Sequence, residues 1–179
     1  LARAMVDIGT HMGRRTVAII TDMNQPLGMA VGNGLEVREA IELLSGKIPE
    51  SDPLYEVSML LATHMLLLAG LAADEAQARE KLRRALQSRA GLEKLSMMLL
   101  ALGGDTACIH APDMLCAVRE KLPVTLGRAG YVSAMRAERI GVAAQLLGAG
   151  RATKADRIDP AVGLVMHKRH GMHVAADEP

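Results

Sequence analysis

The sequence of 179 residues contains no phenylalanine and no tryptophan, and its only tyrosines are Tyr55 and Tyr131. Aliphatic side chains and the 12 methionines must therefore fill the core, and the stacking of nucleic-acid bases on aromatic side chains is implausible. Cysteine is scarce as well. Cys108 and Cys116 match neither a CxxC redox pair nor a zinc site, so we interpret them as reduced thiols of a cytoplasmic protein.

An excess of charge of one sign and a long apolar run are also missing. The 21 basic and 20 acidic residues leave a net charge of +1, which favours neither nucleic acid nor an anionic membrane as a partner. The most apolar window, residues 57–72, is shorter than the roughly 20 residues of a membrane-spanning helix, and it contains His64. We expect a buried core helix there.

The apolar pattern of the first 46 residues predicts an α/β unit. Apolar residues at helical spacing begin at Leu1, and the β-branched run Thr16–Ile20 predicts a strand buried in a parallel sheet. Asn33 followed by Glu36 resembles a capping box, so we expect a helix from there to Gly46. The loop between the strand and this helix therefore lies at a helix N-terminus.

Three further helices are expected before residue 103. Asp52 and Pro53 predict the start of one helix, whose predicted inward stripe comprises Leu54, Val57, Leu61, Met65 and Leu68. Asp74 is expected to cap the charged helix over residues 75–88, and Gly91 separates it from the next helix. From Gly103 onward the sequence is loop-like.

Residues 130–136 and 161–169 have the pattern of strands, and a short helix or turn is expected over 138–148. The predicted fold class is α/β: a helix-rich part of a parallel-sheet domain over residues 1–120, then the start of a small α+β C-terminal domain over residues 121–179. The chain opens inside a helix without a cap, and its end has a hairpin turn without a returning strand. We therefore expect a fragment of a longer protein.

The segment TDMNQPLGMAVGNGLEVREA, residues 21–40, has the character of an ion site. Its glycines let backbone groups turn toward a ligand, and it lies where a buried strand leads into a helix N-terminus. The spacing of Gly28, Gly32 and Gly34 is neither a dinucleotide-binding nor a nucleoside-triphosphate fingerprint. By pattern alone, a structural turn is the better interpretation.

This segment resembles the pyrimidine-nucleoside and thymidine phosphorylases, which carry a near-identical stretch. Two further matches follow in the same order, at GGD (103–105) and at IGVAAQLLGAGRATKADRIDPAVGLVMHK (140–168). The resemblance implies a pentosyltransferase that cleaves pyrimidine nucleosides with phosphate, giving free base and a (deoxy)ribose 1-phosphate. It also implies a homodimer formed through a helical domain absent from this chain.

The resemblance further implies a potassium ion in this loop. Its ligands here would be the carbonyl oxygens of Leu27 and Ala30 and the side chain of Glu39, oxygen donors that suit a hard cation. In the family the phosphate-binding glycine-rich loop and the base-holding residues precede Leu1. We therefore assign no catalytic residue to this chain and expect it to be inactive alone.

Two other interpretations stay open. An anthranilate phosphoribosyltransferase-like enzyme shares the fold class but uses a diphosphate-bearing substrate with magnesium. An inactive truncated protein would keep the loop only as an element of the fold. The resemblance at residues 21–40 and the additional C-terminal domain favour the phosphorylase.

Other polar groups are weaker candidates. His167, His170 and His173 recur every third residue on an expected strand, a spacing that does not bring side chains to one face. Asp22 has the position of a general base, but the family resemblance does not support that function, so we interpret it as a structural cap or loop anchor. Residues 148–151 have the composition of a phosphate-binding turn, and a tight turn is the simpler interpretation.

Overall fold

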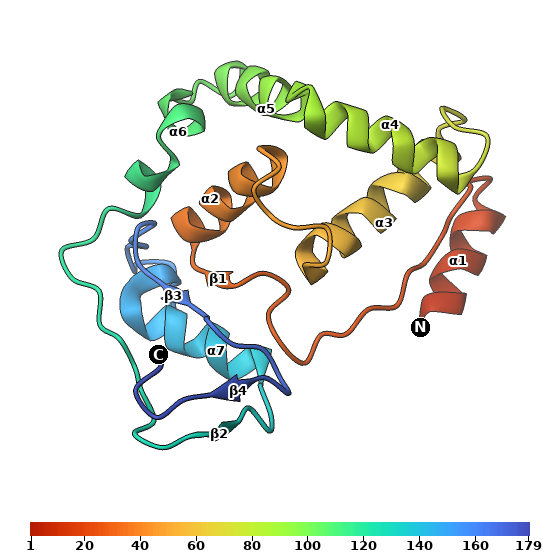
Figure 1. Cartoon of the computed structure of the whole chain (residues 1–179). Coiled ribbons are helices and arrows are strands. Elements are labelled where there is room, and N and C mark those ends of the chain that lie inside the picture. Colours follow the sequence, from red (N-terminus) through yellow and green to blue (C-terminus); the bar gives the residue numbers. More distant parts are fainter. The chain divides into compact units, whose positions relative to one another are not determined.

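The computed structural model describes all 179 residues, which form two compact units. Residues 1–22 and 43–95 make the first unit, and residues 23–42 and 96–179 make the second. Figure 1 shows the course of the chain through the elements of both. The first unit holds α1 (Ala2–His11), α3 (Pro53–Leu68), α4 (Glu75–Gln87) and the start of α5 (Ala90–Ala101).

The second unit contains the four short strands and the remaining helices. Its strands are β1 (Ala30–Val31), β2 (Gly130–Tyr131), β3 (Leu164–Val165) and β4 (His173–Val174). Its helices are most of α2 (Asn33–Leu44), the rest of α5, α6 (Ala107–His110), a 3-10 turn over Pro112–Cys116, α7 (Ala137–Ala144) and a π-helix over Gln145–Ala149. The predicted division into residues 1–120 and 121–179 concerns the domains of a longer protein, and it stays a prediction.

The helices of the first unit begin where the sequence places their caps. Asp52 accepts a hydrogen bond from the N–H of Leu54 at 2.8 Å, and Pro53 occupies the first turn of α3. Asp74 accepts from the N–H of Gln77 at 2.8 Å at the start of α4. These side chains satisfy backbone donors that a helix start leaves unpaired, so both helix starts were predicted correctly.

The buried face of α3 differs from the predicted stripe. Tyr55, Met59 and Thr63 are buried and repeat every four residues, whereas Leu61 and Met65 are 48% and 70% exposed. Helix α3 packs against α4. Because α3 is apolar on nearly all sides, periodicity alone could not identify the face that its neighbour covers.

Residues 16–20 do not form the predicted strand. They have no regular secondary structure, and Ile20 is 86% exposed. A strand of a parallel sheet needs neighbouring strands for its backbone hydrogen bonds, and both sheets of the structure are made by other residues. The segment has the apolar composition of a buried strand, but it is not part of a sheet, so the predicted strand was wrong.

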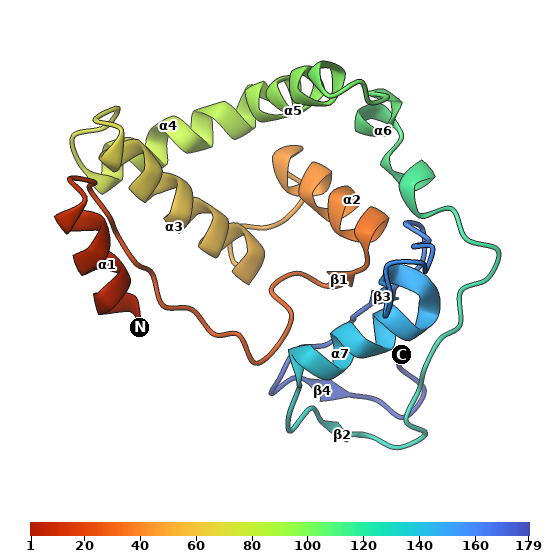
Figure 2. The same cartoon turned by 180° about the vertical axis from the view of Figure 1, so that it is seen from behind.

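Both sheets of the second unit are two-stranded and antiparallel. β1 pairs with β3, with Ala30 opposite Val165, and β2 pairs with β4, with Tyr131 opposite His173. Thus the residues after the Gly171 turn do pair, with β2 and not with β3, which corrects the expected hairpin without a returning strand. Helix α7 packs against β1, as both views show (Figures 1 and 2). The chain is helix-rich with small sheets, in agreement with the predicted α/β class.

Candidate functional site

Residues 24–31 form an irregular loop that leads through β1 into α2. The core of the second unit lies directly beside it, where Ala30, Leu35 and Cys116 are buried together. The N–H of Met166 donates to the carbonyl oxygen of Met29 at 2.7 Å and extends the pairing of β1 with β3 by one residue. The loop is therefore fixed to the C-terminal part of the chain.

The N-terminus of α2 is capped differently from the prediction. The carboxylate of Glu36 accepts a hydrogen bond from the N–H of Gly32 at 3.1 Å, so it reaches back as expected but to Gly32. The side chain of Asn33 instead donates to the carbonyl oxygen of Ala149 at 2.7 Å. The predicted cap residue is thus a tertiary contact, because the helix begins at Asn33 itself.

Glu39 lies over the loop that the sequence assigns to an ion. Its Oε1 atom accepts a hydrogen bond from the N–H of Met29 at 2.7 Å. A methyl group on Gly28 would overlap this carboxylate, so Gly28 leaves the space that Glu39 occupies. Glycine leaves room here for the close approach of a side chain, and the carboxylate meets the loop at Gly28 and Met29, the two residues between Leu27 and Ala30 in the sequence.

The carbonyl of Ala30 is directed away from β3. In an antiparallel pair, residues that exchange hydrogen bonds alternate with residues that do not. Because Met166 donates to Met29, the next pair, Ala30 with Val165, is of the second kind. Its backbone groups therefore face the other side of β1, while Leu27 is a loop residue that is 41% exposed.

These donors have the chemistry of a site for a hard monovalent cation. Carbonyl oxygens and a single carboxylate provide oxygen ligands with little negative charge. No group of three or more His, Cys, Asp or Glu side chains in the structure is arranged to hold a metal ion. The structure therefore brings Glu39 to the loop that carries Leu27 and Ala30, and the ligand assignment itself stays a prediction.

A second glycine of this segment, Gly34, allows its backbone to approach the backbone of other parts of the chain closely. The N–H of Gly34 donates to the carbonyl oxygen of Pro160 at 2.7 Å, and a methyl group on Gly34 would overlap the carbonyls of Pro160 and Leu115. This glycine therefore admits a neighbouring segment of chain. The sequence pattern indicated a ligand-facing loop or a structural turn, and it did not indicate this close contact with Pro160 and Leu115.

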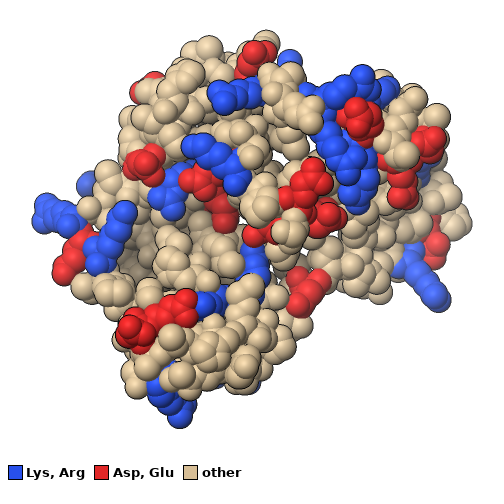
Figure 3. All heavy atoms as spheres, viewed as in Figure 1, with Lys and Arg blue, Asp and Glu red and all other residues tan.

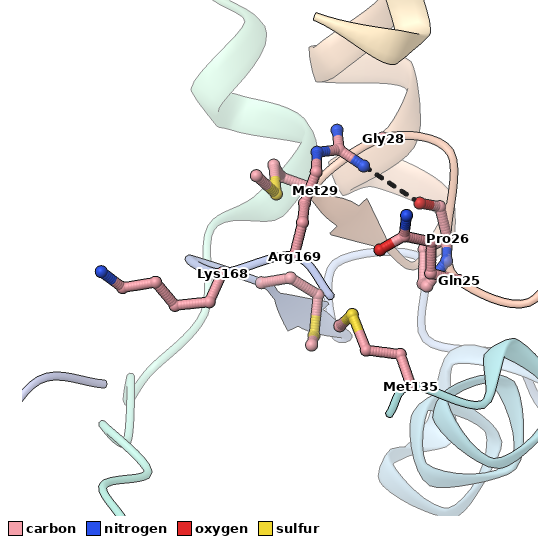
Figure 4. Close-up of a pocket in the computed structure, with 8 residues that line it drawn as sticks. Gln25, Pro26, Gly28, Met29, Met135, Lys168 and Arg169 are labelled. Atoms are coloured by element: carbon pink, nitrogen blue, oxygen red, sulfur yellow. Dashed lines mark hydrogen bonds between the residues drawn. The ribbon is translucent and has the colours of Figure 1, made fainter. Parts of the chain in front are cut away.

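The C-terminal segment supplies two contacts that the sequence did not indicate. Arg169, only 9% exposed, donates through Nη1 to the carbonyl oxygen of Pro26 at 3.2 Å, and Figure 4 shows this bond. The N–H of His170 donates to the side-chain oxygen of Gln25 at 3.1 Å. The crevice lined by these residues admits no water-sized molecule, so it is a packed contact and not a substrate pocket.

The remaining sequence candidates have structural contacts. A ring nitrogen of His170 lies 3.1 Å from the carbonyl oxygen of Ser133. The ring of His173 packs edge-on against Tyr131 with centroids 5.2 Å apart. Gly148 and Ala149 end a π-helix over Gln145–Ala149, and their carbonyl oxygens accept hydrogen bonds from the backbone N–H of Asp159 and the side chain of Asn33, respectively.

Charged side chains give no further indication of a ligand. Basic and acidic residues are interspersed on the face seen in Figure 3. None of the helices has the length and apolar character that crossing a membrane requires.

Comparison with known proteins identifies two family models along the chain. The a/b domain of the glycosyl transferase family matches residues 1–91, and the pyrimidine nucleoside phosphorylase C-terminal domain matches residues 131–179. The first of these alone covers about half of the chain. The two family models therefore cover both parts of the candidate site, the loop within residues 21–40 and the C-terminal residues that contact it.

Individual relatives extend over the whole chain. It is 46% identical over 179 residues to the pyrimidine-nucleoside phosphorylase of Bacillus subtilis (strain 168), and this alignment covers 100% of the chain and 41% of that protein. The pyrimidine-nucleoside phosphorylase of Geobacillus stearothermophilus is 44% identical over 178 residues, covering 99% of this chain and again 41% of the relative. That of Staphylococcus haemolyticus (strain JCSC1435) is 44% identical over 171 residues, which are 96% of the chain and 39% of the relative.

The chain therefore spans about two fifths of the length of these curated relatives. The matches run through the loop of residues 21–40, the packed contact around Arg169 and the C-terminal strands without a change of family. On this evidence, the chain belongs to the pyrimidine-nucleoside phosphorylase family, within the glycosyl transferases that carry this a/b domain.

Proposed function

We propose that the protein to which this chain belongs catalyses the reversible phosphorolysis of pyrimidine nucleosides. The observation that supports this most strongly is the similarity to pyrimidine-nucleoside phosphorylases along the entire chain. In the reaction, the bond between C1′ of the pentose and the base nitrogen breaks, and C1′ bonds to a phosphate oxygen. The products are the free base and a (deoxy)ribose 1-phosphate.

The contribution of this chain is to hold the loop beside the reaction site. Leu27, Ala30 and Glu39 would hold potassium, the carbonyls as neutral ligands and Glu39 as the one charged ligand. When bound, the ion would supply a fixed positive charge near the phosphate subsite. Glu39 also fixes the N–H of Met29, and Gly28 admits its carboxylate, so the loop is shaped before any ion binds.

No residue of this chain is proposed to touch the reacting atoms. By the family resemblance, the groups that bind phosphate and base belong to the portion of the relatives that precedes the matched region. Alone, the 179 residues are therefore proposed to be inactive. The cytoplasmic location and the homodimer through a helical domain are likewise proposals that follow from the same resemblance.

Two alternatives differ in what they predict. An anthranilate phosphoribosyltransferase-like enzyme would use a diphosphate-bearing substrate, and the C-terminal match over residues 131–179 favours the phosphorylase over it. An inactive truncated protein would keep the loop as an element of the fold, and similarity between sequences does not distinguish it from an active enzyme.

The test is an assay of the full-length protein with uridine or thymidine and inorganic phosphate, in which release of free base is followed by chromatography. We expect base release that depends on phosphate, and none from the 179-residue chain assayed in parallel. Release of anthranilate from its phosphoribosyl conjugate with diphosphate, but none of base from nucleosides, would favour the first alternative. Absence of both activities in the folded full-length protein would favour the second.

A further inference from the structure

Backbone and side-chain groups of residues 166–170 hold the loop of residues 24–31 in place. Met166 donates to the carbonyl of Met29 at 2.7 Å, Arg169 to the carbonyl of Pro26 at 3.2 Å, and His170 to the side chain of Gln25 at 3.1 Å. These contacts lie at the two ends of the segment that contains Leu27. The C-terminal segment therefore sets where the Leu27 and Ala30 carbonyls lie.

Arg169 differs from the other two contacts because it places a buried charge at the loop. Its exposed fraction is 9%, and burial of a guanidinium is costly unless its N–H groups are hydrogen-bonded. A carbonyl oxygen of a proline residue is a suitable acceptor, and a charged donor makes this bond stronger than one between neutral groups. The bond fixes the peptide that directly precedes Leu27.

Glu39 reaches the same loop from α2, at Met29. Figure 4 shows the Arg169 side chain directed at the loop from the C-terminal segment, with its guanidinium pointing to Pro26. The loop is thus fixed by an acidic side chain at one point and by a basic side chain three residues earlier. An arrangement of this kind holds a loop in one conformation before a ligand binds, which lowers the cost of binding.

We propose that Arg169 is a positioning residue for the cation site, acting through the Pro26 carbonyl on the Leu27 and Ala30 ligands. This inference rests on the proposed potassium site. Arg169 would touch neither the ion nor the substrates. Its loss leaves the loop free to sample other conformations, so potassium binds more weakly while Glu39 and the loop sequence are unchanged.

The experiment uses the full-length protein and the variants Arg169→Met, Arg169→Lys and Lys168→Met. The midpoint of thermal unfolding is measured over a series of potassium chloride concentrations, with choline chloride keeping the ionic strength constant. Lys168→Met is the matched control, because the neighbouring Lys168 pairs with Glu178 at 2.5 Å and contacts no residue of the loop through a hydrogen bond in the structure.

We expect the potassium concentration for half of the stabilisation to rise about tenfold in Arg169→Met, as for loss of one hydrogen bond to a charged group. Arg169→Lys keeps the charge and a donor, so its shift should be smaller. Lys168→Met should unfold at a lower temperature but keep the wild-type half-concentration. If Arg169→Met does not fold, the comparison of Arg169→Lys with Lys168→Met decides the question.

A purely structural function for Arg169 predicts a different result. The unfolding midpoint would then fall by the same amount in both salts, and the half-concentration of potassium would not change, which would overturn the proposal. A wild-type midpoint that is equal in potassium and choline chloride would overturn the cation site and this inference together. Phosphorolysis by that same wild-type protein would show that the proposed reaction stands independently.

Discussion

Nδ2 of Asn33 donates a hydrogen bond to the carbonyl oxygen of Ala149 at 2.7 Å, across 116 positions of the sequence. The bond joins the first turn of α2 to the end of the π-helix Gln145–Ala149, which follows α7. It therefore connects the loop that carries the candidate cation ligands to the C-terminal region at a second place, separate from the contacts of Arg169. Both connections lie within one compact unit.

Asn33→Ala is expected to destabilise the full-length protein by about 0.5–1 kcal/mol, because one exposed hydrogen bond is lost while the helix keeps its Glu36 contact. Urea unfolding of wild type and variant, compared at equal slope, measures this difference. The matched control is Glu36→Gln, which keeps an oxygen acceptor for the N–H of Gly32 and should change stability less. An Asn33→Ala protein as stable as wild type would show that this contact contributes nothing.

Local sequence signals were sufficient for the helix starts of the first unit. Asp52 and Asp74 accept backbone hydrogen bonds from residues two and three positions ahead, so the information for the cap lies within one turn of helix. The end of α2 near Gly46, which has a φ of 72°, is equally local. Such features do not depend on what the rest of the chain does.

Features that depend on distant partners could not be predicted in the same way. Residues 16–20 have the composition of a buried strand but are not part of either sheet. Helix α3 buries Tyr55, whereas Leu61 of the predicted stripe is exposed. At the site, Asn33 has the residue type of a cap but serves as a tertiary contact. Arg169 had no local signal, since a basic residue after an apolar run is usually an exposed one.

Glu39 can be tested with two substitutions that separate its charge from its hydrogen bond. Glu39→Gln keeps an oxygen for the N–H of Met29 and removes the charge, so stability without potassium should stay near wild type while the stabilisation by potassium is lost. Glu39→Ala removes both, and we expect a further loss of about 1–2 kcal/mol without potassium. Thermal unfolding in potassium and choline chloride measures both effects, and an unchanged potassium effect in Glu39→Gln would exclude Glu39 as a ligand.

Gly28→Ala is expected to destabilise the protein by about 1–2 kcal/mol, because the added methyl group displaces the Glu39 carboxylate, which then loses its hydrogen bond from the N–H of Met29. Gly141→Ala in α7 is the matched control. Apart from its chain neighbours and the backbone of its own helix, no heavy atom lies within 4 Å of the position of its methyl group, and alanine favours a helix, so this variant should be as stable as wild type or slightly more stable.

The overlap also predicts coupling between the two positions. When Glu39 is replaced by alanine, no carboxylate overlaps the methyl group of Gly28→Ala. Gly28→Ala should therefore lower the free energy of unfolding clearly less in the Glu39→Ala protein than in wild type. Denaturant unfolding of the two single variants and the double variant gives the coupling energy. Additive costs would show that Gly28 is required for its backbone and not for the space that Glu39 occupies.

Asp156 predicts a pH dependence of stability. Its carboxylate accepts hydrogen bonds from the N–H groups of Thr153 and Ala152 and from the Thr153 hydroxyl, each at 2.9 Å. The backbone hydrogen bond from Thr153 is the largest of the effects that lower the pKa of this carboxyl below its ordinary value of 3.8, followed by the hydroxyl of Thr153 and the N–H of Ala152. A lowered pKa in the folded state stabilises the protein above pH 3.8, and this contribution is lost as the pH falls through the folded value.

Asp156→Asn keeps the shape of the side chain and removes the titration. We expect wild type to unfold at a higher temperature than Asp156→Asn at pH 7, and the difference to shrink as the pH falls below 3.8. The difference in unfolding midpoint between the two proteins over a pH series measures this, because groups that titrate in both proteins cancel. Thr153→Val, which removes only the hydroxyl donor, should reduce the difference without abolishing it. A difference that stays constant down to the lowest pH at which both proteins fold would contradict a carboxylate stabilised by this turn.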